Sequence, residues 1–235
     1  MVLDIARSVK NALLPMGPAV RRLPLGIARA LSIEIDFRHH SGLYLGLYEI
    51  ELNSHLKRLC YPGARCFDVG GHIGYDALVL ACLSRNDVIT FESDERLCAA
   101  IRRTVAANPE YSQRITVVQG FVDETSSAAG VISLDEFVSA EGGGLPDFMK
   151  IDVEGAEARV LRGAERILME SQPNLIVETH GLDVEQECIS ILQNHRYTPV
   201  TVNSRRWLPD NRPGQINRWV VCEGGPKRAS PRASR

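Results

Sequence analysis

From Ala64 onward, short apolar runs alternate with longer segments in which apolar residues recur at helical spacing. Runs this short and this apolar are typical of parallel strands covered on both faces, and they predict strands near 65–69, 87–92, 115–118, 147–153 and 174–179. The segments between them predict helices at 75–84, about 94–107 and 156–169, and a last helix that follows the strand at 174–179 and ends near residue 195. The order predicts an α/β protein with a Rossmann-like, doubly wound sheet and helices on both faces, closed by strands near 197–202 and 216–222.

The two ends of the chain differ from this alternating core. Residues 1–31 carry five basic residues and one acid, and apolar residues at helical spacing precede the prolines at 15 and 18. We expect an amphipathic basic extension packed on the core or at its ligand-binding edge; contact with a membrane surface is the less favoured alternative. Residues 224–235 are rich in Gly, Ser, Pro and Arg and predict a disordered basic tail. Residues 32–223 would then form the main domain.

Composition narrows the functional class. The chain has 235 residues, 44% of them hydrophobic, which suits one domain with a substantial core. A net charge of −2 lacks the basic excess of a nucleic-acid-binding protein. The six cysteines form no C-x-x-C pair, no membrane-spanning apolar stretch is present, and no signal peptide is recognisable. We therefore expect a cytoplasmic protein with reduced, mostly buried thiols.

The first predicted strand ends in a turn that suits a nucleoside-bearing ligand. Asp68 is followed by Gly70, Gly71 and Gly74 before the next helix begins, so the backbone can approach a ligand closely. The second strand ends in Glu92, whose carboxylate can accept hydrogen bonds from both hydroxyls of a ribose.

These two acids separate the cofactor classes. A dinucleotide would place its pyrophosphate over the glycine turn, where Asp68 would repel it, and the G-x-G-x-x-G spacing would need glycine at position 69, which is Val69. S-adenosylmethionine has no phosphate and carries an ammonium and a sulfonium, so Asp68 becomes favourable. The turn predicts S-adenosylmethionine, with a nicotinamide-dependent oxidoreductase as the alternative.

The strand predicted at 147–153 ends in an unusual group of charges. Lys150, Asp152 and Glu154 alternate with apolar residues, although a buried strand rarely carries three charges without partners or a function. Gly155 then leads into a helix whose first turn holds Glu157, at the positive end of the helix dipole. The alternative to a functional role is that Lys150 pairs with an acid and Glu157 only caps the helix.

Several blocks of this sequence resemble the FkbM family of S-adenosylmethionine-dependent methyltransferases. They occur in the family's order over roughly residues 43–180 and comprise Phe67–Tyr75, Phe91–Ser93, Ser133–Asp135, Met149–Glu157, Val160–Ala164 and Val177–His180. The resemblance implies a seven-stranded sheet with the last strand antiparallel, and methylation of a hydroxyl on a sugar, glycan or other small molecule. This sequence departs from the family's common pattern at Gly71-His72 and at Ser93.

Carried onto this sequence, the resemblance implies a set of cofactor-binding residues. Asp68, Gly70, Gly71 and Gly74 would line the methionine end, Glu92 would hold the ribose, and Phe121 would border the adenine.

The remaining strand-end residues are candidates for the chemistry. An alcohol acceptor loses a proton as the methyl group is transferred, so a general base is expected among Asp152, Glu154, Glu178 and His180. A divalent metal on Asp152, Glu178 and His180 is a possible but less favoured arrangement. A non-catalytic small-molecule binder on the same fold is the remaining functional alternative.

Overall fold

The computed structural model describes residues 17–141, 144–205 and 217–225. Its centre is a seven-stranded sheet in the order β10-β11-β9-β8-β3-β4-β5. The strands are β3 (Cys66–Val69), β4 (Val88–Glu92), β5 (Ile115–Gln119), β8 (Phe148–Ile151), β9 (Asn174–His180), β10 (Val200–Asn203) and β11 (Asn217–Cys222). β11 runs antiparallel to both of its neighbours, and the other pairs are parallel. The predicted Rossmann-like sheet, with its last strand antiparallel, is confirmed.

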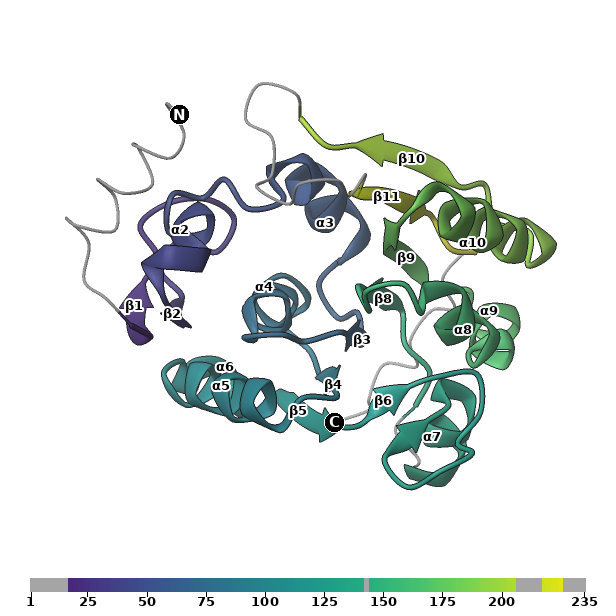
Figure 1. The fold of residues 1–235 in the computed structure, drawn as a ribbon, viewed down its shortest axis with the longest axis horizontal. Helices are drawn as coiled ribbons and strands as arrows, with labels where there is room; N and C mark the ends of the chain where they lie inside the picture. Colours follow the sequence, from purple (N-terminus) through teal and green to yellow (C-terminus); the bar gives the residue numbers. More distant parts are fainter. Residues whose placement is uncertain (1–16, 142–143, 206–216, 226–235) are drawn as a thin grey trace, which may run out of the picture.

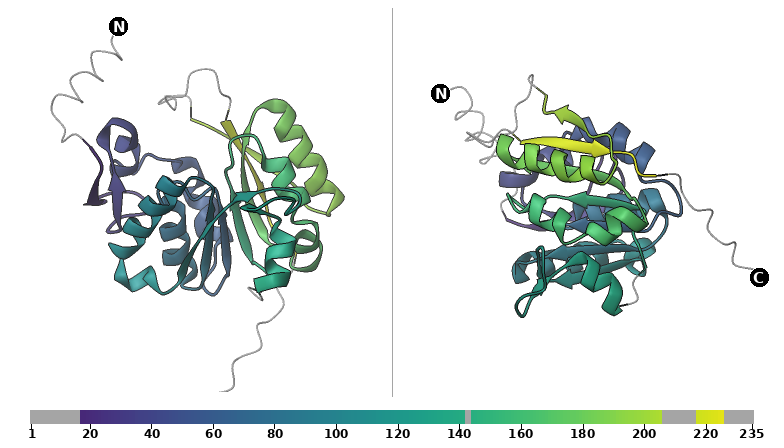
Figure 2. Two further views of the ribbon diagram at one scale, coloured as in Figure 1. Left: turned by 60° about the horizontal axis from the view of Figure 1, so that its bottom comes forward. Right: turned by 90° about the vertical axis from the view of Figure 1, so that its right-hand side faces the viewer.

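Two layers of helices cover the sheet (Figures 1 and 2). One layer contains α3 (Asn53–Leu59), α4 (Tyr75–Ser84), α5 (Glu95–Ala106) and the short α6 (Pro109–Ser112). The other contains α7 (Leu134–Glu141), α8 (Glu157–Arg162), α9 (Glu165–Glu170) and α10 (Leu182–Asn194). Successive residues of a strand point to opposite faces, so Cys66 and Phe148 join one core while Phe67 and Met149 join the other. None of the helices in the described ranges is long and apolar enough to cross a bilayer.

The chain order creates a switch point in the sheet. The chain moves from β3 outward to β4 and β5, then returns to place β8 and β9 on the other side of β3. The carboxyl ends of β3, β4 and β8 lie at one edge of the sheet, and the chain leaves β3 and β8 in opposite directions there. Open α/β sheets bind ligands at such a point. A small parallel pair, β6 (Phe121–Val122) and β7 (Val131–Ile132), lies after β5 near this edge.

One of the predicted helices is divided into two in the structure. The helix expected over 156–169 breaks between α8 and α9 at Gly163 and Ala164. The Gly163 carbonyl accepts from the backbone of Asp135 and the hydroxyl of Ser133, and a Cβ at Gly163 would collide with the Asp123 backbone. The Asp135 carboxylate then caps α9 by accepting from the backbone of Arg166 and Ile167. The break comes from a distant segment, which helical periodicity cannot reveal.

The segment before Ala64 contains elements that the apolar pattern did not predict. β1 (Ala19–Arg22) pairs antiparallel with β2 (Ser32–Ile35), followed by α2 (Phe37–Tyr44) and η1 (Ile50–Leu52). Leu23 and Leu31 are buried in the same core as α4, and the segment between them contains bends and turns. The expected helix in the first residues lies outside the described ranges. Since the boundary expected after residue 31 falls between two paired strands, residues 19–31 pack with the domain.

Candidate functional site

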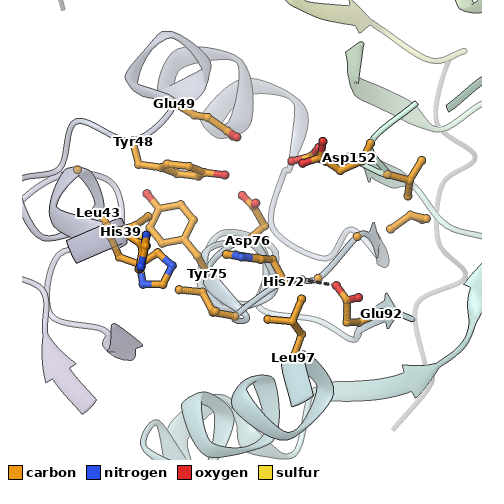
Figure 3. A pocket seen from close by; sticks show the side chains of 18 of the residues that line it. His39, Leu43, Tyr48, Glu49, His72, Tyr75, Asp76, Glu92, Leu97 and Asp152 are labelled. Carbon is orange, nitrogen blue, oxygen red and sulfur yellow. Dashed lines mark hydrogen bonds between the residues drawn. The ribbon is translucent and has the colours of Figure 1, made fainter. Parts of the chain in front are cut away.

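A cavity of about 1320 Å³ lies at the carboxyl ends of β3, β4 and β8 (Figure 3). Its wall comes from stretches of chain that meet there, around residues 38–49, 69–76, 91–97, 120–122 and 152–154, together with Arg205. Pockets that hold one drug-sized ligand usually measure about 300–1,000 Å³. The cavity is thus large enough for a cofactor and a second small molecule.

The glycine turn after β3 forms one side of the cavity. The N–H groups of Gly70 and Gly71 both donate to the carbonyl of Phe91 at 2.9 Å. Gly70 has φ +98°, and a Cβ there would collide with the Asp152 backbone, while a Cβ on Gly71 would collide with Thr90. Glycine is therefore required where β3, β4 and β8 come closest. Gly74 begins α4 beside α5 and is not among the lining residues.

Glu92 lines the cavity and holds this turn in place. Its Oε2 accepts from the backbone of His72 at 2.9 Å (Figure 3), and its Oε1 accepts from the backbone of Asp94 at 3.0 Å. Each carboxylate oxygen has a second acceptor position. The Ser93 hydroxyl approaches that of Oε1 at a long 3.5 Å, so a ligand hydroxyl can displace it. Phe121 also lines the cavity with 39% of its surface exposed. The assigned roles of Glu92 at the ribose and Phe121 at the adenine stay predictions.

Asp68 lies beside the cavity rather than in its wall. It is 1% exposed, and its Oδ2 accepts from the hydroxyl of Thr90 at 2.8 Å. Burial, together with the nearby charge of Asp76, raises the pKa of Asp68 to about 7. The carboxylate that reaches the cavity from the start of α4 is Asp76, which no sequence motif marked as a candidate. A direct contact between Asp68 and the methionine end stays a prediction.

Lys150 is fully buried in a charge cluster. Its Nζ lies 2.6 Å from Asp76 and 3.1 Å from Glu49, whose side chains face the cavity near Tyr48 (Figure 3). Burial alone would lower the pKa of Lys150, but Asp76 and then Glu49 raise it, and the net pKa is well above its usual value. The alternative that Lys150 pairs with an acid is confirmed, although its partners come from distant segments.

A second charge cluster lies where β8 and β9 end. His180 Nδ1 is 2.6 Å from Glu157 Oε1, and His180 Nε2 is 3.6 Å from Asp152 Oδ1 and from Glu154 Oε2. Glu178 Oε1 lies 3.8 Å from the same Nε2, and its Oε2 accepts from the indole of Trp219 at 3.2 Å. The four candidate residues for chemistry are thus brought together. Asp152 and Glu154 line the cavity, and Glu178 and His180 are outside its lining.

The electrostatics of this cluster favour positive charge. Burial lowers the pKa of His180, but the hydrogen bond to Glu157 and the charge of Asp152 outweigh it and raise the pKa overall. Burial raises the pKa of Asp152 to about 7 against the opposing influence of Lys150. Glu157 is completely buried and also accepts from the backbone of Gly155 at 2.9 Å. It therefore orients His180, a role that helix capping alone did not predict.

Backbone strain is concentrated around the cavity. Glu49, His72 and Glu154 line it, and all three adopt left-handed backbone conformations with φ of 41°, 47° and 52°. For residues other than glycine such conformations cost about 1–3 kcal/mol each and tend to persist at functional sites. The strain supports this cavity as the functional region.

Comparisons with known proteins identify proteins that share the family model or the fold of this chain. Residues 119–212 match the family model described as "Methyltransferase FkbM domain". Among solved structures, a methyltransferase FkbM from Methylobacillus flagellatus KT aligns with a TM-score of 0.54 and 20% identity, covering 68% of this chain and 43% of that one. The present chain thus spans less than half the length of that protein. No curated protein sequence matches the chain.

Two further structures share the fold. Precorrin-6y C5,15-methyltransferase from Geobacter metallireducens GS-15 has a TM-score of 0.54 and 16% identity, covering 75% of this chain and 88% of that one. Aeropyrum pernix fibrillarin, solved with natively bound S-adenosyl-L-methionine, has a TM-score of 0.52 and 14% identity, covering 70% and 68%. At these identities the likeness concerns the fold. The chain has the fold of S-adenosylmethionine-dependent methyltransferases. The predicted resemblance to the FkbM methyltransferases is confirmed over residues 119–212, where the family model matches.

Proposed function

We propose that this protein transfers a methyl group from S-adenosylmethionine to a hydroxyl of a sugar, glycan or other small molecule. The acidic wall of the cavity carries the proposal, because Asp76, Glu92 and Asp152 surround the glycine turn. Two lining arginines, Arg38 and Arg205, have acidic partners in Asp36 and Glu51. An acidic wall suits the ammonium and sulfonium of S-adenosylmethionine and opposes the pyrophosphate of a dinucleotide.

The proposed cofactor position follows from the lining residues. The ribose hydroxyls would bind the open acceptor positions of Glu92, and the adenine would lie beside Phe121. The methionine end would then reach across Gly70 and Gly71 toward Asp76 and Asp152. This places the transferable methyl group on the Asp152 side of the cavity, where room is left for the acceptor.

The chemistry needs geometry more than activation. The sulfonium already makes the methyl group electrophilic, so in-line placement of the acceptor supplies much of the rate. The acceptor hydroxyl must lose its proton as the new bond forms. We assign that proton to Asp152, the carboxylate of the second cluster that both lines the cavity and lies beside the glycine turn. His180 would position Asp152 from outside the cavity.

Binding and turnover measurements test the proposal directly. We expect calorimetry to show binding of S-adenosylhomocysteine and no binding of NAD. Methyl-labelled S-adenosylmethionine should then label hydroxyl compounds from a panel of glycans, sugars and polyketide-like alcohols. NAD binding without a response to S-adenosylhomocysteine would favour the oxidoreductase. Cofactor binding with no labelling of any alcohol would favour a non-catalytic binder.

Replacing Glu92 by alanine should weaken S-adenosylhomocysteine binding by about 1–3 kcal/mol, because hydrogen bonds to a charged acceptor are lost. Isothermal titration calorimetry measures this change, and circular dichroism checks that the turn at His72 has not unfolded the protein. Glu95→Ala is the matched control, since Glu95 is an exposed acid at the start of α5. An unchanged dissociation constant for Glu92→Ala would contradict the ribose assignment.

A further inference from the structure

The second charge cluster contains a histidine whose two ring nitrogens have opposite surroundings. Nδ1 lies 2.6 Å from Glu157 Oε1, a hydrogen-bonding distance to a buried carboxylate. An ionised carboxylate can only accept, so Nδ1 carries the proton, and in the neutral ring Nε2 presents its lone pair. Nε2 faces Asp152 Oδ1 at 3.6 Å and Glu178 Oε1 at 3.8 Å. These separations are too long for hydrogen bonds.

In this arrangement two buried hydrogen-bond acceptors, His180 Nε2 and Asp152 Oδ1, face each other. The His180 side chain is 5% exposed, and among the described residues neither its Nε2 nor Asp152 Oδ1 has a hydrogen-bond partner. The nearby buried cation, Lys150, is held by Asp76 and Glu49. While His180 is neutral, its Nε2 and Asp152 Oδ1 are buried acceptors that face one another, which is costly. A positive charge between them, either a proton on Nε2 or a bound cation, removes that cost.

The spacing of these atoms suits a metal ion. One ligand atom from each of Asp152, Glu178 and His180 lies within 4.8 Å of the other two. Ligands held about 2.0–2.2 Å from a small divalent cation are separated by roughly 3–4.4 Å from one another. Small side-chain rotations would therefore complete the coordination.

We propose that Asp152, Glu178 and His180 bind a divalent cation of the Mn²⁺ type, with Glu157 orienting His180. One imidazole and two carboxylates favour Mn²⁺ over Mg²⁺, which prefers oxygen ligands, and this ligand set contains no thiolate to select a softer ion. A carboxylate on the second ring nitrogen is the usual support of a metal-bound histidine. Asp152 lines the cavity, so the free coordination positions would face it.

The site would also affect the acceptor, and this consequence alone rests on the proposed function. Bound through Oδ1 of Asp152, the cation leaves the second oxygen of that carboxylate for the acceptor hydroxyl. A hydroxyl beside a divalent cation gives up its proton more easily. The cation would thus act on the acceptor hydroxyl and not on S-adenosylmethionine.

Manganese binding can be measured without turnover. The full chain is stripped of metal with a chelator, and the chelator is removed. The chain is then titrated with Mn²⁺, and loss of the electron paramagnetic resonance signal of free Mn²⁺ reports binding. We expect one ion per chain, and we expect Glu157→Gln to weaken binding about 10–100-fold. His180→Ala should abolish binding. His195→Ala is the matched control, because His195 contacts the Ile191 carbonyl far from this cluster and should leave binding unchanged.

Thermal denaturation guards against a variant that only unfolds. Mn²⁺ should raise the melting temperature of the parent and of His195→Ala but not that of His180→Ala. Absence of Mn²⁺ binding to the parent at millimolar concentration, or unchanged binding in His180→Ala, would overturn the site. A parent that binds S-adenosylhomocysteine but no Mn²⁺ overturns the site alone. One that binds Mn²⁺ but no S-adenosylhomocysteine overturns the proposed function alone.

Discussion

Replacing Lys150 by methionine should lower the free energy of unfolding by about 3–5 kcal/mol, because removal of one partner leaves buried charges uncompensated. Lys150 is 1% exposed and is the cation that compensates Asp76 and Glu49. Urea denaturation of the parent and the variant measures the difference. The loss should greatly exceed that of an exposed ion pair, which contributes about 0–1 kcal/mol.

Two further variants identify the cause of the lost stability. Lys57→Met is the matched control, since Lys57 is exposed on α3, and its free energy of unfolding should stay close to that of the parent. Adding Asp76→Asn and Glu49→Gln to Lys150→Met should recover much of the loss, because the buried carboxylates are then neutral amides. If Lys150→Met alone is as stable as the parent, the stability of this cluster does not depend on Lys150.

Replacing Asp152 by asparagine should lower methyl-transfer turnover about 10²–10⁴-fold, the usual contribution of a positioned general base. Asparagine nearly preserves the size of the side chain but cannot take up the hydroxyl proton. Affinity for S-adenosylhomocysteine should stay within a few-fold of the parent, because this ligand lacks the sulfonium charge on the Asp152 side and the assigned ribose contact is at Glu92. Initial rates with labelled S-adenosylmethionine and calorimetry separate the two effects.

The matched control for this variant is Asp183→Asn, an exposed acid in the first turn of α10. It should retain the turnover of the parent. Near-parental turnover in Asp152→Asn, with full cofactor binding, would show that another group accepts the proton. A large loss of cofactor affinity would instead place Asp152 at the cofactor.

Much of the sheet could be predicted because its strands are short apolar runs. Burial on both faces leaves no polar alternation in a strand such as Phe148–Ile151, apart from Lys150, so the run stands out from the amphipathic helices around it. The elements missed before Ala64 have the opposite character. The burial of β1 alternates between intermediate and exposed residues over only four positions, which is too short to be recognised by period.

Candidate site residues were recognisable where chain order places them at strand ends. Asp152, Glu178 and His180 were singled out in this way, and the structure brings their side chains within reach of one another. The contacts within the Lys150 cluster were not recognisable from the sequence. Lys150 reaches Glu49 across 101 residues of sequence, and no local spacing encodes such a distance.

By itself, the sequence determined the order of strands and helices, the glycine turn and the strand ends at which polar groups would gather. These features depend on local periodicity and on the backbone freedom of glycine, both of which are properties of neighbouring residues. Only the tertiary structure decided that Asp68 is buried beside Thr90 while Asp76 reaches the cavity, and that Glu157 holds His180. The physical reason is that burial and charge pairing depend on which distant segments meet, and those contacts set the protonation and orientation of each side chain.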